Sequence, residues 1–415
     1  MKIIGMKGSK EIIVCFIVLL CISSTVGLKL LNTGLPTLGE AEPKPNDHFK
    51  SFSTICRQKG YPFEQHKLKT YDGYFLTVFR IPGAKGELLE PAIKANKPVV
   101  LLWHGLLDSA DSWIINDEDK APALMLANQG YDVWLGNSRG NKYSREHRFL
   151  DPDRDEDKAS FFGFNIEDMA NHDTNSTVAY IRQETGKRSI GVIGHGIGAT
   201  QFLLSPQTGI EVLVTLGAYS SLNHTQEKLI TTLANNPKLI ENLKDAKMYE
   251  VFGEDYVSNK IFSAICENSP SVCQYLLEDI MLVESEYINI DRVDEMLSLF
   301  PSGTSLENLE HFVQIYTTKK FQKYDYGLEL NRKIYDHDIP PLFDLSESPN
   351  FRVVQIVGEE DHISTPLDNH WLNSQLESSV EYYGSFRIGH YSFILGKDMS
   401  YLEEIIKLFK QDQWS

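Results

Sequence analysis

The chain has 415 residues, 42% of them hydrophobic, so it is long enough for one large domain with an insertion or for two domains. Its formal net charge of −17 disfavours binding to nucleic acid and to anionic membranes at neutral pH. We expect no bound metal ion and no cofactor.

The first 27 residues are typical of a secretory signal peptide. The first ten residues contain Lys2, Lys7 and Lys10. The eleven-residue apolar run Ile12–Ile22 follows, and then small residues up to Gly27. Because this run is too short to span a bilayer, we expect cleavage after about Gly27 and no stable transmembrane anchor. An uncleaved membrane anchor is the alternative. Cleavage would leave a formal charge of −19 and a secreted or lysosome-like protein suited to an acidic lumen.

If the chain is secreted, we also expect a disulfide bond and glycosylated asparagines. Cys266 and Cys273 are close enough in sequence to form a small-loop disulfide in an oxidising compartment, which would leave Cys56 as an unpaired, buried thiol. Asn175 and Asn223 each begin an Asn-x-Ser/Thr sequon, so both are predicted glycosylation sites.

Apolar runs alternate with helical patterns over most of the chain. Strands are predicted at Glu64–Thr70, Tyr74–Pro82, Pro98–Trp103, Tyr131–Leu135, Ser189–Ile193, Val212–Ala218, Phe351–Val357 and Val380–Ile388. Helices are predicted at Ala121–Gln129, Phe164–Thr185, Ala199–Ser205 and Tyr401–Lys410. This alternation predicts an α/β fold with a doubly wound, mostly parallel sheet.

The composition changes in the second half of the chain. From about Ser221 to Pro341 the sequence is polar, helix-prone and interrupted by Pro, Gly and Asn, with no strong strand. We interpret residues 221–341 as a helical cap or lid inserted into a core. The core is then formed by residues 28–220 and 342–415.

One stretch, Ser189–Ser205, carries the most information about chemistry. It predicts a buried strand, a tight turn over Gly194–Gly198, and a helix that Pro206 ends. Strand, glycine-rich turn and helix form the context of the nucleophile elbow G-x-S-x-G of α/β-hydrolases. The central position here is Gly196, which has no side-chain atom able to attack a substrate. The pattern therefore indicates a hydrolase scaffold without its nucleophile.

The other groups of an acyl-transfer site have good candidates in the expected chain order. Asp361 follows the strand Phe351–Val357, and His390 follows the last predicted strand, as the acid and base of a triad would. The loop after Pro98–Trp103 predicts that the backbone N–H of Leu106 is one oxyanion-hole donor, with Ile197 as the second.

A literal G-x-S-x-G pattern also occurs at Gly136–Gly140. Its continuation is strongly polar, no apolar helix follows it, and it precedes the expected position of the elbow. We therefore do not expect Ser138 to be a nucleophile.

Several stretches resemble the acid lipases, the family of gastric and lysosomal acid lipase. They include His104–Trp113 (HGLLDSADSW), Gly130–His147 (GYDVWLGNSRGNKYSREH), Phe164–Asp173 (FNIEDMANHD) and Pro301–Phe312 (PSGTSLENLEHF). The resemblance extends from about Lys50 to Lys410. It implies an α/β-hydrolase core, a helical cap with a lid, secretion or lysosomal delivery, and hydrolysis of neutral lipid esters.

The same resemblance assigns individual residues. Asp361 and His390 match the acid and base of the family, and Leu106 matches its oxyanion residue. Gly196 stands where the family has serine, and Ile197 stands where it usually has glutamine. We therefore expect a secreted lipase-like protein with impaired catalysis, an apolar pocket for neutral lipid, and contact with lipid interfaces. A working ester hydrolase with an unconventional mechanism and a non-catalytic interaction protein are the alternatives.

Overall fold

A computed structural model describes residues 51–87, 97–204, 208–253, 284–345, 350–376 and 379–411. The predicted signal peptide and the Cys266–Cys273 pair lie outside these residues, so both stay predictions. Cys56 is a buried free thiol, and burial raises its pKa to about 12. Among the described helices none combines the length and the apolar character that crossing a bilayer requires.

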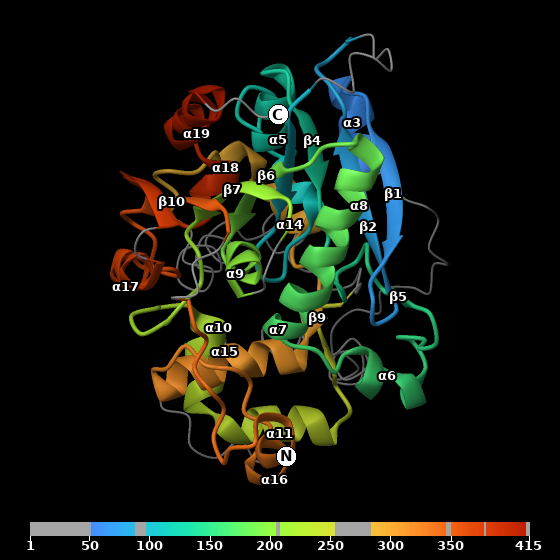
Figure 1. Cartoon of the computed structure of the whole chain (residues 1–415), viewed down its shortest axis with the longest axis vertical. Coiled ribbons are helices and arrows are strands. Elements are labelled where there is room, and N and C mark those ends of the chain that lie inside the picture. Colours follow the sequence, from blue (N-terminus) through green and yellow to red (C-terminus); the bar gives the residue numbers. More distant parts are fainter. Residues whose placement is uncertain are drawn as a thin grey trace, which may run out of the picture.

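A nine-stranded sheet organises the core (Figure 1), and eight of its strands follow the order β1-β2-β4-β3-β6-β7-β10-β11. The strands are β1 (Glu64–Lys69), β2 (Tyr74–Ile81), β3 (Val99–Trp103), β4 (Asp132–Leu135), β5 (Glu146–His147), β6 (Ile190–His195), β7 (Ile210–Leu216), β10 (Arg352–Gly358) and β11 (Val380–Phe386). The six strands from β4 to β11 are parallel, whereas β2 pairs antiparallel with β1, β4 and β5. The α/β prediction is confirmed.

Burial along the strands follows from their position in the sheet. Every residue of β3 and β6 is buried, because helices cover both faces of the centre of the sheet. In contrast, β1 and β11 lie at the two edges, and buried positions are few in both strands. The polar sequence of β1 (EQHKLK) therefore matches a less covered edge of the sheet.

Helices pack on both faces of the sheet and build two apolar clusters. One cluster includes residues of α3 (Phe52–Lys59), α5 (Pro122–Asn128) and α19 (Ser400–Gln411). The other includes residues of α8 (Asn175–Thr185), α9 (Ile197–Leu204) and α17 (Pro366–Leu376). The remaining core helices are α6 (Asp155–Phe161), α7 (Ile166–Asp168) and α18 (Ser392–Leu395). The prediction did not include α3, α6, α17 or α18.

The long helix predicted at Phe164–Thr185 is interrupted. It begins at Ile166, capped by Asn165, contains a π-helical turn at Met169–Thr174, and ends at Thr185. Gly186 ends it in the left-handed region at φ 70°, as predicted. The single-helix prediction was wrong over the middle turn, because a sequence pattern of three-and-four spacing does not distinguish a π turn from an α turn.

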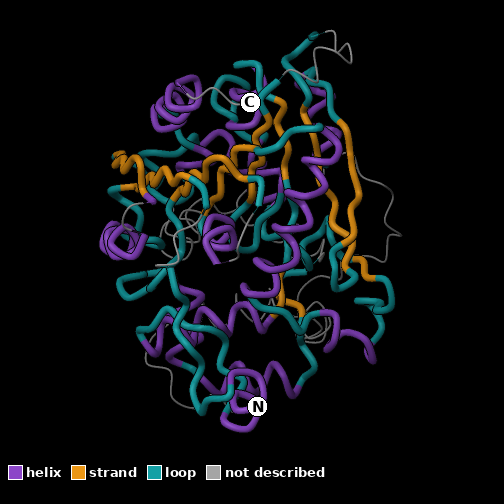
Figure 2. Tube along the Cα trace, in the orientation of Figure 1, coloured by secondary structure: helices purple, strands orange, loops and turns teal. Residues whose placement is uncertain are grey.

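Within the described part of the predicted cap (221–253 and 284–341), the residues form helices and very short strands. They are α10 (Lys228–Asn235), α11 (Pro237–Asp245), β8 (Glu250–Val251), α14 (Val293–Leu299), β9 (Thr304–Ser305), α15 (Leu306–Thr318) and α16 (Leu328–Tyr335). Around α11 and α16, the lower end of the molecule in Figure 2 consists of helices and loops. Buried side chains of α10, α11 and α15 belong to the apolar cluster that contains α8, α9 and α17, whereas those of α14 belong to the cluster that contains α3 and α5.

Candidate functional site

The turn between β6 and α9 is tighter than predicted. The strand extends to His195 and the helix begins at Ile197, so Gly196 alone forms the corner, with φ +53°. A Cβ atom added at Gly194 would lie 2.5 Å from the Cα of Ala199, and one added at Gly198 would lie 2.3 Å from the carbonyl oxygen of His104. Glycine at both flanking positions therefore allows the helix to pack directly on the strand ends.

Asp361 and His390, which are far apart in sequence, are hydrogen-bonded side chains. His390 Nδ1 and Asp361 Oδ2 are 2.7 Å apart, and both residues are buried. The other carboxylate oxygen, Asp361 Oδ1, accepts hydrogen bonds from the backbone N–H groups of Ile363 and Ser364 at 2.9 and 2.7 Å. These bonds fix the carboxylate, so it can hold the imidazole in one tautomer and orientation.

The free side of the His390 ring faces Gly196. A Cβ atom added at Gly196 would lie 3.3 Å from His390 Nε2 and 3.3 Å from Cε1 of Tyr219. This is the position from which a side-chain hydroxyl would reach the ring nitrogen. The turn, the histidine and the aspartate therefore meet in one place, and the turn residue lacks a side chain.

A second histidine supports the first. His195 Nε2 lies 3.1 Å from the carbonyl oxygen of His390, and the two ring centroids are 4.3 Å apart. Burial lowers the pKa of His195 well below its ordinary value, so the ring is neutral and donates its Nε2 proton to the carbonyl oxygen. His195 thus orients the His390 backbone. Its position inside the elbow pattern was the available signal, and sequence reasoning missed this role.

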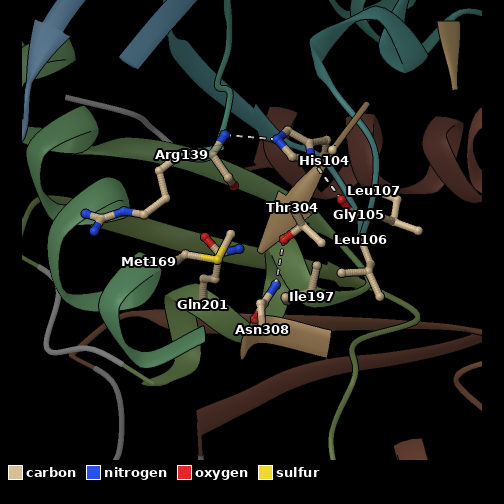
Figure 3. A pocket seen from close by; sticks show the side chains of 12 residues that line it. His104, Gly105, Leu106, Leu107, Arg139, Met169, Ile197, Gln201, Thr304 and Asn308 are labelled. Atoms are coloured by element: carbon tan, nitrogen blue, oxygen red, sulfur yellow. Dashed lines mark hydrogen bonds between the residues drawn. The ribbon is translucent and has the colours of Figure 1, made fainter. Parts of the chain in front are cut away.

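The loop after β3 lies against the start of α9. Leu106, Leu107 and Ile197 line one small cavity, together with residues of β9, α9 and α15 (Figure 3). Ile197 is the first residue of α9, where a backbone N–H has no partner four residues earlier in the helix. The two residues predicted as oxyanion donors are therefore neighbours around the same cavity.

His104 holds this loop in place. Its Nδ1 is 2.8 Å from the carbonyl oxygen of Gly105, and its Nε2 accepts the backbone N–H of Ser138 at 3.0 Å. Burial lowers the pKa of His104 to about 4, so the ring stays neutral and can donate through Nδ1 while accepting through Nε2. Sequence reasoning identified the His-Gly-Leu loop but missed this bridge to Ser138.

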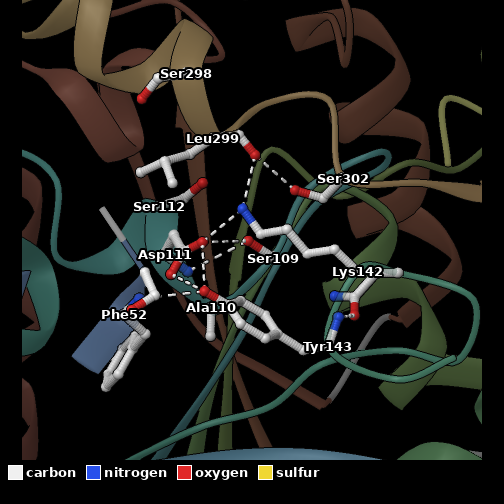
Figure 4. Close-up of polar contacts among 12 residues, drawn as sticks. Phe52, Ser109, Ala110, Asp111, Ser112, Lys142, Tyr143, Ser298, Leu299 and Ser302 are labelled. Carbon is white, nitrogen blue, oxygen red and sulfur yellow. Dashed lines mark hydrogen bonds and ion pairs between the residues drawn. The ribbon is translucent and has the colours of Figure 1, made fainter. Parts of the chain in front are cut away.

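Polar contacts join the same loop to the segment after α14 (Figure 4). Lys142 Nζ forms an ion pair with Asp111 Oδ2 at 2.7 Å and donates to the carbonyl oxygen of Leu299 at 2.9 Å. The backbone N–H of Ser302 donates to the carbonyl oxygen of Leu107 at 2.7 Å. The segment that leads to β9 is therefore tied to the loop that carries Leu106.

The predicted glycosylation sites differ in their surroundings. Asn175 is half-buried at the start of α8, and its Nδ2 donates to the carbonyl oxygen of Asn171 at 3.0 Å. Asn223 is also half-buried, and its backbone N–H donates to Asp368 at 3.0 Å. Glycosylation at both positions stays a prediction. Within the described ranges, no group of three His, Cys, Asp or Glu side chains is arranged to hold a metal ion.

Comparison with known proteins identifies lipases as relatives. Family models for a partial α/β-hydrolase lipase region and for the α/β hydrolase fold match residues 52–117 and 98–247. The chain is 31% identical over 374 residues to lipase member K of Homo sapiens, covering 86% of this chain and 89% of the relative. It is 32% identical over 366 residues to gastric triacylglycerol lipase of Bos taurus, covering 85% and 89%.

One solved structure supports the fold. A candidate lipase from Sulfolobus solfataricus has a TM-score of 0.53 at 16% identity, with 84% of this chain and 94% of the other covered. At this identity the similarity concerns the fold alone, which is that of an α/β-hydrolase.

Proposed function

This chain belongs to the acid lipase family, and from that premise we propose that it is a secreted lipase-like protein of neutral lipid ester metabolism with impaired hydrolysis. In this proposal Gly196 occupies the position of the nucleophile, and Asp361 and His390 are the remaining members of the triad. The backbone N–H groups of Leu106 and Ile197 form the oxyanion hole.

One observation carries the proposal. The built Cβ position at Gly196 is 3.3 Å from His390 Nε2, while His390 Nδ1 is engaged by Asp361 at 2.7 Å. A general base thus faces a turn residue that has no hydroxyl to deprotonate. Hydrolases that use aspartate or cysteine as the nucleophile at this position are excluded as well, because glycine has neither a carboxylate nor a thiol.

The expected size of the defect is large. In subtilisin, loss of the nucleophilic serine lowers turnover by about 10⁶-fold, which corresponds to roughly 8 kcal/mol of activation free energy. An oxyanion hole and substrate binding can together retain about 10³–10⁴-fold over the reaction in water. We therefore expect residual hydrolysis far below that of a working lipase.

Substitution at Gly196 tests the catalytic part of the proposal. We compare the natural protein with its Gly196→Ser and Gly196→Ala variants on short- and long-chain acyl esters at about pH 5 and pH 8. We expect Gly196→Ser to raise turnover by at least about 10³-fold, because it adds the missing hydroxyl. Gly196→Ala is the matched control, since it adds the same Cβ and backbone strain without a nucleophile.

Lipase-like turnover by the natural protein would contradict the proposal. Equal turnover by the serine and alanine variants would also contradict it, because the hydroxyl would then have no role. A small shift of the His390 ring is expected in both variants, since a Cβ contact of 3.3 Å is tight.

The binding part of the proposal is that an apolar pocket for neutral lipid remains. Family membership supports it, because the name of the relative gastric triacylglycerol lipase gives a lipid ester as the substrate of that relative. Lipid extraction from the purified protein, followed by exchange with a radiolabelled triacylglycerol, tests it. A protein that carries no lipid and exchanges none would contradict this part and leave the catalytic part unaffected.

A second candidate function is slow hydrolysis in which His390 activates a water molecule directly. The intact Asp361–His390 hydrogen bond of 2.7 Å favours it, because such a pair is a competent general base. In this case His390→Ala would abolish the residual turnover of the natural protein. Unchanged residual turnover in His390→Ala would exclude this mechanism.

A further inference from the structure

The small cavity under the Leu106 loop brings together two parts of the molecule that are distant in sequence. Its core side is formed by the His104–Leu107 loop, Ser138 and Gln201, and its other side by Thr304 and Asn308. In Figure 3, Gln201 of α9 is drawn beside Met169, and Asn308 of α15 lies below Thr304, to which it is hydrogen-bonded. The cavity volume is about 10 Å³, which is the space of about one water molecule.

Three side chains that line this cavity have polar atoms without a protein partner within the described part of the chain. They are Ser138 Oγ, Gln201 Nε2 and Asn308 Oδ1. Ser138 is 2% exposed, and Gln201 and Asn308 are 0% exposed. A buried polar group without a hydrogen bond is strongly unfavourable, so three around one cavity require a common explanation.

The hydrogen-bonding character of the three atoms defines the ligand. Trp103 Nε1, which can only donate, donates to Gln201 Oε1 at 3.0 Å and so leaves Gln201 Nε2 as a free donor. Asn308 Nδ2 donates to Thr304 Oγ1 at 3.1 Å, which leaves Asn308 Oδ1 as an acceptor. The Ser138 hydroxyl can donate or accept. One donor, one acceptor and one hydroxyl complement a water molecule, whereas an anion would not satisfy the acceptor.

We propose that this cavity binds one structural water molecule that links Asn308 to Ser138 and Gln201. The water accepts from Gln201 Nε2, donates to Asn308 Oδ1 and exchanges a third hydrogen bond with Ser138 Oγ. Leu106 and Ile197 line the same cavity, so the water also supports the two residues whose N–H groups form the proposed oxyanion hole. Asn308 is then a positioning residue that acts on the core through water.

Crystal structures of the whole protein and of two variants test the water directly. We expect one water peak within about 3.2 Å of all three polar atoms in the natural protein. Asn308→Leu removes the acceptor and should lose or displace the peak. Met169→Leu is the control, because Met169 also lines the cavity but offers no strong hydrogen-bonding group, and it should keep the peak.

A dry cavity in the natural protein would overturn the proposal. So would a bromide peak at this position in anomalous data from a bromide-soaked crystal, which would identify an anion site. A water peak that persists unchanged in Asn308→Leu would remove Asn308 from the proposal and overturn the link.

Hydrogen exchange tests the support given to the loop, independently of any esterase activity. We expect the amides of Leu106 and Leu107 to exchange at least about fivefold faster in Asn308→Leu than in Met169→Leu. Equal exchange in the two variants would overturn the positioning role. If Asn308→Leu does not fold, Ser138→Ala replaces it in both measurements, with the same expected results.

Discussion

Two glycine-flanked turns follow β4 and β6, the two parallel strands on either side of β3, and each turn has a group that the other lacks. Gly136–Gly140, after β4, has a serine at its centre, whereas the turn after β6 has Gly196 facing a histidine. The imidazole beside the first turn is His104, which uses Nε2 to accept the backbone N–H of Ser138 and stays neutral with a pKa of about 4. The G-x-S-x-G pattern thus identifies a turn in the sequence. Whether that turn can be catalytic depends on the side chain that faces it.

The strongest test of this comparison is covalent labelling with a serine-reactive fluorophosphonate probe. We expect no labelling of the natural protein, because Ser138 is 2% exposed and no base engages its hydroxyl among the described residues. The Gly196→Ser variant should be labelled at position 196, which peptide mass spectrometry identifies. Labelling of the natural protein at Ser138 would make the first turn catalytic and reverse the comparison.

The next largest effect concerns Arg139, which gives the first turn a structural role. Its guanidinium is buried and forms ion pairs with Asp72 at 2.6 Å and Asp173 at 2.8 Å. Because Arg139→Met would leave the fully buried Asp173 without its charge partner, we expect it to lower the free energy of unfolding by about 3–5 kcal/mol. Urea unfolding measures this loss.

Arg332 provides the matched control for that experiment. It pairs with Asp338, but both side chains are 60% exposed. Solvent screens such a pair, so Arg332→Met should change the free energy of unfolding by less than about 0.5 kcal/mol. A similar small loss in Arg139→Met would show that the first turn does not depend on its buried ion pairs.

A smaller, pH-dependent effect is expected at Asp108, in the loop after β3. Its carbonyl oxygen accepts from Asn141 Nδ2 at 3.3 Å, and burial raises the pKa of its carboxyl to about 6. The stabilisation from this raised pKa is complete below about pH 4 and is lost as pH rises through about 6. Asp108→Asn should therefore be more stable than the natural protein at pH 7, by up to about 3 kcal/mol, with little gain at pH 4.

Unfolding by urea at pH 4 and pH 7 measures the effect of Asp108→Asn. Asp117 is the control of opposite sign, because a hydrogen bond from Arg292 lowers the pKa of its carboxyl. Asp117→Asn should lose stability at neutral pH. A stability gain in Asp108→Asn that is equal at both pH values would contradict a titrating carboxyl.

The strand predictions succeeded where nearly every residue of a strand is buried, because such a strand is a continuous apolar run in the sequence. The apolar runs at β3, β6 and β7 predicted those strands to within about two residues, since each is buried on both faces. Helices α17 and α18 were missed for different physical reasons. Helix α17 contains the buried polar residues Asp368 and Asn369, whose side chains accept hydrogen bonds from Ser221 and Gln355 of distant elements. Helix α18 is only four residues long.

The candidate site was predicted only where roles depend on chain order. Asp361, His390 and the elbow could be assigned because each follows a strand of the parallel sheet, and parallel strands end at one edge. In contrast, the bridge from His104 to Ser138 and the Asp72–Arg139–Asp173 ion pairs join residues 34 or more positions apart. Local sequence carries no signal for such pairings.

The two-stranded ladder formed by β8 and β9 has a consequence for how this protein can vary. Glu250 pairs with Ser305 and Val251 with Thr304, so the ladder closes the chain between them into a loop whose ends are neighbours. The entropic cost of closing a flexible loop grows only with the logarithm of its length, by about 0.6 kcal/mol per doubling. Because α14 lies within this loop and packs in the core, only changes of loop length that keep α14 in place would cost the hydrolase core little stability.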